Sequence, residues 1–286
     1  MLRSHLVSRR VLRTATTLTL ALGAGLALPT ALATTAGAAA PSATAAVNFN
    51  GRELSYTAAA GQANQVTVTE SFTSDTDLTY VIDDAVPINA GNGCSYPDSA
   101  DDTKVSCTVE TVDSQSPYDS LVMDLADSDD VLSFHNKSDQ AFYTNGIDLG
   151  TGDDELTDIS GVDANAVWGG VGDDTITVGE AGLAFGGEGN DTLYGIGDGA
   201  IAAGGAGNDL LRGSAGDQNL QGDDGHDKLY GGDDGDHMQG GRGNDVMYGE
   251  GGPDFMWGNT GDDELYGGAG TDTLSGGAGR NIVVQD

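Results

Sequence analysis

Aspartate recurs at a fixed interval through the C-terminal half of this 286-residue chain. It takes the sixth place of a nine-residue unit at Asp191, Asp209, Asp227, Asp236, Asp245, Asp254, Asp263 and Asp272. Looser units upstream place Asp154 and Asp174 in the same position. Carboxylates held close together near a protein surface repel by about 1 to 3 kcal/mol per neighbouring pair, and a hard cation with oxygen ligands reverses that repulsion. The spacing therefore predicts that all of these aspartates are calcium ligands.

Glycines surround each of these aspartates. The units read GGAGNDLLR, GSAGDQNLQ, GDDGHDKLY, GGDDGDHMQ, GGRGNDVMY, GEGGPDFMW, GNTGDDELY, GGAGTDTLS and GGAGRNIVV without a break from Gly204 to Val284. Looser copies begin at Gly186, Gly169 and Leu149. Glycine adopts positive φ at little cost, so this part of each unit can turn sharply and direct its carbonyls at one point. Calcium accepts such carbonyls together with carboxylates.

An apolar residue in the eighth place follows each turn and predicts a short strand with an inward-facing middle side chain. Two units make one coil of eighteen residues, and successive coils stack about 4.8 Å apart. The core ladders are then Leu193, Leu211, Leu229, Met247 and Leu265, facing Leu220, Met238, Met256 and Leu274. The aspartates form one ladder along each edge of the coils. The predicted fold class is all-β, a parallel β-roll or β-solenoid.

The pattern Gly-Gly-x-Gly-x-Asp-x-apolar-x resembles the calcium-binding nonapeptide repeat of the RTX family, also called the hemolysin-type repeat. The resemblance covers roughly half of the chain, and consecutive copies in one register make it specific. It implies a β-roll that binds calcium. An acidic, solvated repeat kept for solubility is the alternative, and it explains the charge but not the fixed glycines.

The array is uneven at several of the predicted sites. The unit at Gly169 is followed by the next after seventeen residues, one short of a coil, which makes a site joining Asp174 to Asp191 doubtful. On the second edge, Ala200 and Gln218 occupy acidic places. Only two Asp-paired sites are therefore expected on that edge, against four on the first.

Residues 41–145 differ in composition from the repeats. The segments QVTVTESF, LTYVID, KVSCTVETV, SLVMDL and DVLSF predict strands by alternation and β-branched content. LADSDDVLS, from Leu125, reads as a degenerate unit with Asp130 in the acidic place. We expect a β-rich cap of irregular early coils, followed by calcium-binding repeats over 146–286; a separate β-sandwich is the alternative. The region is similar to the front ends of secreted actinobacterial RTX proteins.

Residues 1–40 have the features of a secretory signal peptide. A basic start, MLRSHLVSRRVLR, precedes an apolar run and then small residues. The general secretory route is favoured over the twin-arginine route. A secreted, extracellular protein is expected, with cleavage after Ala33, Ala38 or Ala40.

Charge and cysteine content narrow the class of protein. With 45 acidic and 11 basic residues the net charge is −34, so nucleic acids and anionic membranes are poor partners. No segment outside the signal is long and apolar enough to span a bilayer. Cys94 and Cys107 are the only cysteines. An exported protein favours a disulfide between them over two buried thiols.

Catalytic motifs are absent from the sequence. It contains neither His-Glu-x-x-His nor Gly-x-Ser-x-Gly, and His135, His226 and His237 are interpreted as surface residues. Ninth-place residues eighteen apart form an outward stripe that suits stacking for stability or, less favoured, sugar or peptide binding: Tyr194, Arg212, Tyr230, Tyr248 and Tyr266. A secreted, monomeric, non-enzymatic calcium-binding protein is the favoured function. A calcium-dependent adhesin or glycan-binding protein is second, and a calcium-stabilised extracellular hydrolase third.

Overall fold

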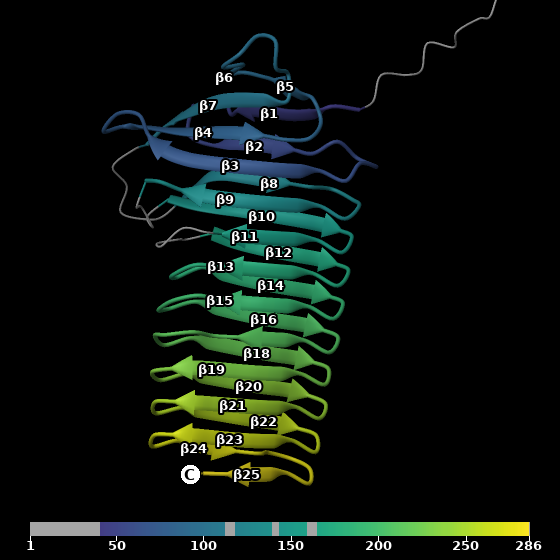
Figure 1. Ribbon diagram of the computed structural model, residues 1–286, viewed down its shortest axis with the longest axis vertical. Coiled ribbons are helices and arrows are strands. Elements are labelled where there is room, and N and C mark those ends of the chain that lie inside the picture. The colour runs from purple at the N-terminus through teal and green to yellow at the C-terminus, as the bar shows by residue number, and fades with distance from the viewer. Residues whose placement is uncertain (1–40, 112–117, 139–142, 159–164, 286) are drawn as a thin grey trace, which may run out of the picture. The chain divides into compact units, whose positions relative to one another are not determined.

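The computed structural model describes residues 41–111, 118–138, 143–158 and 165–285, so the predicted signal peptide lies outside the described part. The described residues form strands joined by turns, with no helix among them, and hence no helix that could cross a bilayer. They belong to the compact unit Ala40–Asp286. Two sheets build this unit (Figure 1), as the repeat pattern predicted.

Sheet I and sheet II take alternate strands of the chain. Sheet I runs in the order β24 (Thr273–Ser275), β22 (Phe255–Thr260), β20 (His237–Arg242), β18 (Asn219–Asp224), β16 (Ile201–Ala206), β14 (Leu183–Glu188), β12 (Asn165–Val171), β10 (Tyr143–Thr151), β8 (Tyr118–Asp124), β2 (Leu54–Thr57), β1 (Ala43–Val47) and β5 (Ile88–Ala90). Sheet II runs in the order β25 (Ile282–Val284), β23 (Glu264–Ala269), β21 (Val246–Gly251), β19 (Lys228–Asp233), β17 (Leu210–Arg212), β15 (Thr192–Gly195), β13 (Thr175–Val178), β11 (Glu155–Asp158), β9 (Val131–Asn136), β3 (Gln65–Phe72), β4 (Asp77–Asp83), β7 (Lys104–Glu110) and β6 (Cys94–Ser95).

From β8 onward every pairing within a sheet is parallel, because the chain completes one coil before it returns to the same sheet. We call the turns from sheet I to sheet II the first edge and the turns from sheet II back to sheet I the second edge. In Figure 1 the first edge lies on the right. The register pairs Leu193 with Leu211 and Leu211 with Leu229, and it pairs Met238 with Met256. Both predicted core ladders are confirmed.

The core is thin in the repeats and fuller near the N-terminus. Most repeat strands contribute one fully buried apolar side chain, such as Leu211 or Met247, and the last two strands contribute none. The early strands bury larger groups, including Tyr56, Tyr80 and Phe134. Apolar burial contributes about 25 cal/mol per Å², so the N-terminal coils gain more from their core than the repeats do.

The first seven strands depart from the coil pattern by pairing antiparallel. β1 pairs with β2, and β4 pairs with both β3 and β7 in this way. The same strands still continue the two sheets, since β2 pairs parallel with β8 and β3 with β9. The alternating segments that predicted strands all form them. The hairpin pairing was not predicted.

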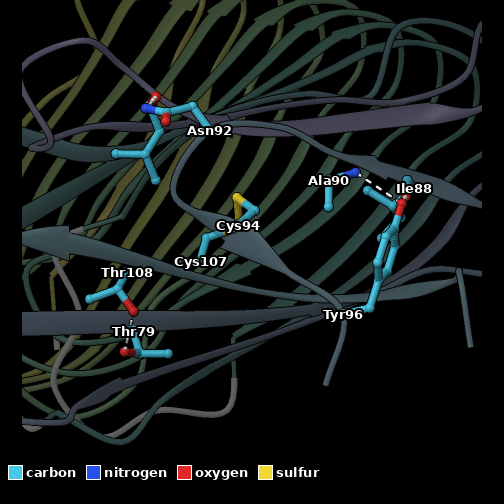
Figure 2. Close-up of a disulfide and its surroundings, with 9 residues drawn as sticks. Thr79, Ile88, Ala90, Asn92, Cys94, Tyr96, Cys107 and Thr108 are labelled. Atoms are coloured by element: carbon cyan, nitrogen blue, oxygen red, sulfur yellow. Dashed lines mark hydrogen bonds between the residues drawn. A yellow bond between two sulfur atoms is a disulfide. The ribbon is translucent and has the colours of Figure 1, made fainter. Parts of the chain in front are cut away.

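The predicted disulfide joins Cys94 on β6 to Cys107 on β7 across an antiparallel pair (Figure 2). Cys107 is fully buried. The hydroxyl of Tyr96 donates to the carbonyl oxygen of Ile88 at 2.9 Å and accepts from the backbone N–H of Ala90 at 3.1 Å. These contacts fix the short loop between β5 and β6 beside the disulfide.

The seventeen-residue coil keeps the register of its neighbours. Thr175 pairs with Thr192, and β12 pairs with β14 in step. The missing residue falls in a second-edge turn, since Thr175 lies eight positions before Leu183 whereas Thr192 lies nine before Ile201. The first edge therefore stays regular through this coil.

Candidate calcium sites

The first edge carries an uninterrupted ladder of carboxylates. In each step the backbone N–H of one aspartate donates to Oδ1 of the aspartate one coil further on, at 2.7 to 3.1 Å. The members are Asp130, Asp154, Asp174, Asp191, Asp209, Asp227, Asp245 and Asp263. Asn281 closes the ladder by accepting from the N–H of Asp263 at 2.9 Å.

The step between Asp174 and Asp191 is formed like the others. The N–H of Asp174 donates to Oδ1 of Asp191 at 2.9 Å, although only seventeen residues separate them. The short spacing therefore does not misalign these two residues, and a calcium site joining them stays untested. The shortened coil absorbs its missing residue on the opposite edge and leaves the carboxylates aligned.

Every aspartate of the ladder has a second carboxylate oxygen with no partner. The side chains are at most 2 % exposed, and Oδ2 of each is buried without a hydrogen-bond donor among the described residues. A buried polar atom without a partner costs about 1 to 3 kcal/mol, and more when it carries charge. Such a row of buried, unpaired anionic oxygens requires a ligand that supplies positive charge.

From Gly169 onward, the glycine that begins each first-edge turn faces these oxygens. A Cβ atom placed on Gly186 would lie 2.1 Å from Oδ2 of Asp191 and 2.5 Å from the carbonyl oxygen of Gly204, one coil on. A Cβ on Gly222 would meet Asp227 Oδ2 at 2.4 Å in the same way. A carboxylate oxygen and a carbonyl oxygen thus converge beside a residue that must lack a side chain. This oxygen set fits calcium, which takes six to eight oxygen ligands of both kinds.

The side chains alone do not complete a metal site. Within the described ranges no three His, Cys, Asp or Glu side chains gather closely enough to hold a metal ion. A cation on either edge would therefore depend on backbone carbonyls for most of its ligands, as the glycine-rich turns predicted.

Burial raises the pKa of the ladder carboxyl groups. Desolvation is the largest cause, and neighbouring aspartates raise the pKa further, while the hydrogen bond from the preceding backbone N–H lowers it in part. The pKa of Asp227 is raised to about 7 and that of Asp191 to about 6. Without a cation, the ladder therefore holds protons more firmly than free aspartate does.

On the second edge, the residue type at the ladder position changes along the chain. The register positions run Asn145, Asn165, Gly182, Ala200, Gln218, Asp236, Asp254 and Asp272. The last three repeat the first-edge geometry: the N–H of Asp236 donates to Asp254 Oδ1 at 2.9 Å, and Asp254 to Asp272 at 3.1 Å. Their Oδ2 atoms are likewise buried and unpaired. All ten aspartates predicted as ligands thus lie on one of the two edges.

Sequence reasoning left Asp130 out of the predicted metal ligands. It lies twenty-four residues before Asp154, outside the eighteen-residue spacing, yet its N–H donates to Asp154 Oδ1 at 2.7 Å and its own Oδ2 is buried and unpaired. The degenerate unit LADSDDVLS was the available signal. The first edge therefore begins one coil earlier than the regular units indicate.

A second, outer ladder of side chains on the first edge was missed. The residue just before each ladder aspartate accepts the backbone N–H of its neighbour one coil away. Thus Asn190 Oδ1 accepts from Asn208 at 3.0 Å, and His226 Nδ1 accepts from Asn244 at 2.7 Å. These exposed bonds hold the turns in register without a cation.

The repeats match a known protein family. The family described as RTX calcium-binding nonapeptide repeat (4 copies) matches residues 159–181, 183–195, 196–229, 203–238, 213–247, 221–256 and 248–283. No curated protein matches the chain.

Proposed function

Since this chain carries the calcium-binding nonapeptide repeats of the RTX family, we propose that it is a secreted, non-enzymatic protein with a structural or interaction role that calcium switches on. The observation that carries the proposal is the row of buried, unpaired Oδ2 atoms along both edges. In a chain of net charge −34 these carboxylates oppose folding on their own.

The chain's own residues prepare each turn for the ion. A backbone N–H holds one oxygen of each ladder aspartate, which aims the other into the glycine-lined turn. When bound, calcium supplies the positive charge that offsets repulsion along the ladder. Extracellular calcium sites need dissociation constants of only about 10⁻⁴ to 10⁻³ M. The chain could thus remain unfolded in a calcium-poor cytoplasm and fold after export.

Circular dichroism during a calcium titration of residues 41–286 tests this function. Without calcium we expect little β structure, and with millimolar calcium a full β spectrum, because a ligand that binds only the folded state shifts the equilibrium by mass action. Magnesium is the control, since it prefers a smaller octahedral site. A full β spectrum in excess chelator at neutral pH would rule out the calcium switch.

Export is tested separately from folding. The full chain, produced in a bacterial host that exports proteins, should appear in the culture medium with an N-terminus that follows Ala33, Ala38 or Ala40. Retention of the uncleaved chain in the cytoplasm would contradict secretion without affecting the calcium result.

A glycan-binding adhesin is the second candidate, and the outer face of sheet I favours it. Two outward positions on each sheet I strand from β12 to β24 carry no Asp, Glu, Lys or Arg; they hold Ala166, Trp168, Leu183, Phe185, Ile201, Ala203, Asn219, Gln221, His237, Gln239, Phe255, Trp257, Thr273 and Ser275. Charged residues follow at the first-edge ends of these strands, at Glu188, Asp223, Asp224 and Arg242. The rings of Phe255 and Trp257 lie nearly parallel, and the Phe255 side chain is 40 % exposed. Uncharged aromatic and amide groups on so acidic a chain suit a neutral polysaccharide.

A glycan pull-down with and without calcium distinguishes this candidate. If the face binds neutral glycans, Trp257→Ala should lose retention in calcium, while Tyr248→Ala, on the opposite sheet, should keep it. Equal retention of both variants and the parent chain would exclude sheet I as the binding face.

A further inference from the structure

Gln218 takes an aspartate position on the second edge, but its side chain makes contacts that no aspartate of the array makes. The side chain is 2 % exposed. Its Nε2 lies 2.6 Å from the carbonyl oxygen of Gly216, 3.1 Å from that of Ala215 and 3.1 Å from that of Gly197, one coil back. Its Oε1 accepts the backbone N–H of Ser214 at 3.0 Å.

The carbonyl group of Gln218 occupies the position that the free carboxylate oxygen takes in the neighbouring turn. A Cβ atom on Gly213 would lie 2.2 Å from Gln218 Oε1 and 2.0 Å from the carbonyl oxygen of Gly231. One coil further on, a Cβ on Gly231 would lie 2.4 Å from Asp236 Oδ2. The amide nitrogen of Gln218 therefore extends past this oxygen position into the carbonyl-lined turn.

Gln218 and Asp236 differ in whether their buried polar atoms have hydrogen-bond partners. Asp236 leaves Oδ2 buried and unpaired, whereas both polar atoms of Gln218 have backbone partners. A carboxamide nitrogen carries two hydrogens with partial positive charge, so it satisfies two of the three nearby carbonyls at a time. It presents positive charge to oxygens where calcium would otherwise be required.

We propose that the carboxamide of Gln218 replaces a calcium ion in the turn 213–218 and closes that turn without metal. Nε2 lies among these three carbonyl oxygens at hydrogen-bond distances of 2.6 to 3.1 Å, where calcium would bind the same oxygens at about 2.3 to 2.6 Å. Gln218 also marks a boundary. Before it the second edge has Gly182 and Ala200, and after it come three aspartates. Its N–H donates to Asp236 Oδ1 at 2.8 Å, which joins the metal-free turn to the carboxylate turns.

This inference rests on calcium binding by the repeats and not on secretion or on a partner. Gln218→Asp removes the amide nitrogen and places a carboxylate in the turn. The added ligand charge should raise the calcium affinity of this turn. Gln221→Asp is the matched control, since it adds the same charge three residues away on the outer face of β18, outside the carbonyl-lined turn.

Calorimetric calcium stoichiometry is the first measurement. Gln218→Asp should bind one more calcium ion than the parent chain, and Gln221→Asp the same number as the parent. An unchanged stoichiometry in a folded Gln218→Asp variant would overturn the inference.

Amide exchange in the calcium-loaded parent chain is the second measurement, and it does not depend on the variant's folding. The side-chain amide protons of Gln218 should exchange with solvent at least tenfold more slowly than those of Gln221, which lies on the outer face. Equal exchange rates would overturn the inference. The calcium stoichiometry of the parent chain tests calcium binding by the repeats. A failure of the proposed function is therefore distinguishable from a failure of the inference about Gln218.

Discussion

Asp245 shows how one residue serves two turns. Its N–H donates to Asp263 Oδ1 at 3.1 Å, and its own Oδ1 accepts the N–H of Asp227 at 2.9 Å. We expect Asp245→Ala to weaken two adjacent calcium sites together, because it removes the carboxylate that lies between them and the hydrogen bond that this carboxylate accepts from the N–H of Asp227. Calorimetry should show a loss of stoichiometry or of affinity spread over two sites.

Asp224→Asn is a matched control for that variant. It removes one negative charge from an exposed carboxylate that pairs with Arg242 at 3.0 Å on the surface, where an ion pair is worth at most about 1 kcal/mol. Its stoichiometry should equal that of the parent chain. If Asp245→Ala bound as many ions with unchanged affinity, the ladder would not be the ligand set.

The raised pKa values of the ladder carboxyl groups predict that the stability of the calcium-free fold and the calcium affinity depend on pH in opposite directions. Asp227 is raised to about 7 and Asp191 to about 6, from about 3.9 in an unfolded chain. Because the folded state holds these protons more tightly, the calcium-free fold is most stable below about pH 4 and loses that stability as the pH rises through 6 to 7. Calcium affinity should change in the opposite direction, since the ion competes with the protons.

Circular dichroism in chelator at pH 4.5 and pH 7.5 checks the first half of this prediction, and calorimetry at pH 5.5 and pH 7.5 the second. We expect more β structure in chelator at the lower pH and weaker calcium binding at pH 5.5. Calcium affinity independent of pH across this range would mean that the buried carboxylates are not the ligands.

At the level of residues, the spacing predicted all ten aspartates but not the role of Gln218. A repeat unit shows which carboxylate is absent. It does not show that a side chain one methylene longer can reach Gly216 and Gly197 with a donor group. Asp130 was left out of the predicted ligands because its spacing from Asp154 is irregular, and the strand pairing shows that it keeps the register of the ladder.

The tyrosine stripe on sheet II links neighbouring strands by ring stacking. Tyr248 stacks between Tyr230 and Tyr266 with ring centroids 5.1 and 5.0 Å apart, and the guanidinium of Arg212 lies 4.2 Å from the Tyr230 ring centroid. Because neighbouring rings cover each other's faces, the stripe has little ring face left for a sugar. The stacking for stability that the sequence favoured is supported over ligand binding.

Tyr248→Ala should therefore lower the free energy of unfolding in calcium by about 1 to 3 kcal/mol, since two stacked pairs contribute about 0.5 to 1.5 kcal/mol each. Denaturant unfolding measures the change. Tyr194→Ala is the control, because no aromatic ring stacks on Tyr194 within the described part of the chain and its loss should be smaller. Equal losses would show that stacking adds nothing beyond burial.

The disulfide links β6 and β7 covalently. It joins two cysteines thirteen positions apart in the sequence, and closing a loop of that size contributes about 3 kcal/mol of loop entropy. Reduction should reduce hydrogen-exchange protection in β4 to β7 more than in β19 to β23. Equal loss in both regions would mean that the early strands and the repeats unfold as one unit.

Strand positions in the early region were predictable, but their pairing was not. The segment QVTVTESF matches β3 residue for residue, because alternation is a local property. β3 and β4 form a local hairpin, but the antiparallel pairing of β4 with β7 joins segments that β5 and β6 separate in the sequence. A hydrophobic pattern places a strand in a sheet without naming its neighbour.

Across the described part of the chain, we expect dependence on calcium to increase toward the C-terminal coils. The early coils have the larger core, the disulfide and a second edge with amide side chains such as Asn145 and Asn165. From Asp236 onward both edges carry buried carboxylates. The repeat count and the charge predicted calcium dependence, but not this gradient, because it arises from which edge each irregular unit joins.

Chelator should consequently unfold the C-terminal coils first. Hydrogen exchange at a series of calcium concentrations should show protection lost over residues 231–275 before residues 65–110. The opposite order, or simultaneous loss at every concentration, would contradict the gradient.

The hydrogen bonds of the first-edge ladder all run in one direction. In every step the donor N–H lies in the coil nearer the N-terminus and the accepting carboxylate in the next coil. A carboxylate is thus oriented only when the coil before it is already in place, which couples each site to its predecessor as in a one-dimensional lattice with nearest-neighbour interactions. We expect growth of such a lattice to be templated from its N-terminal end, and its calcium isotherm to be sigmoidal with a Hill coefficient above one.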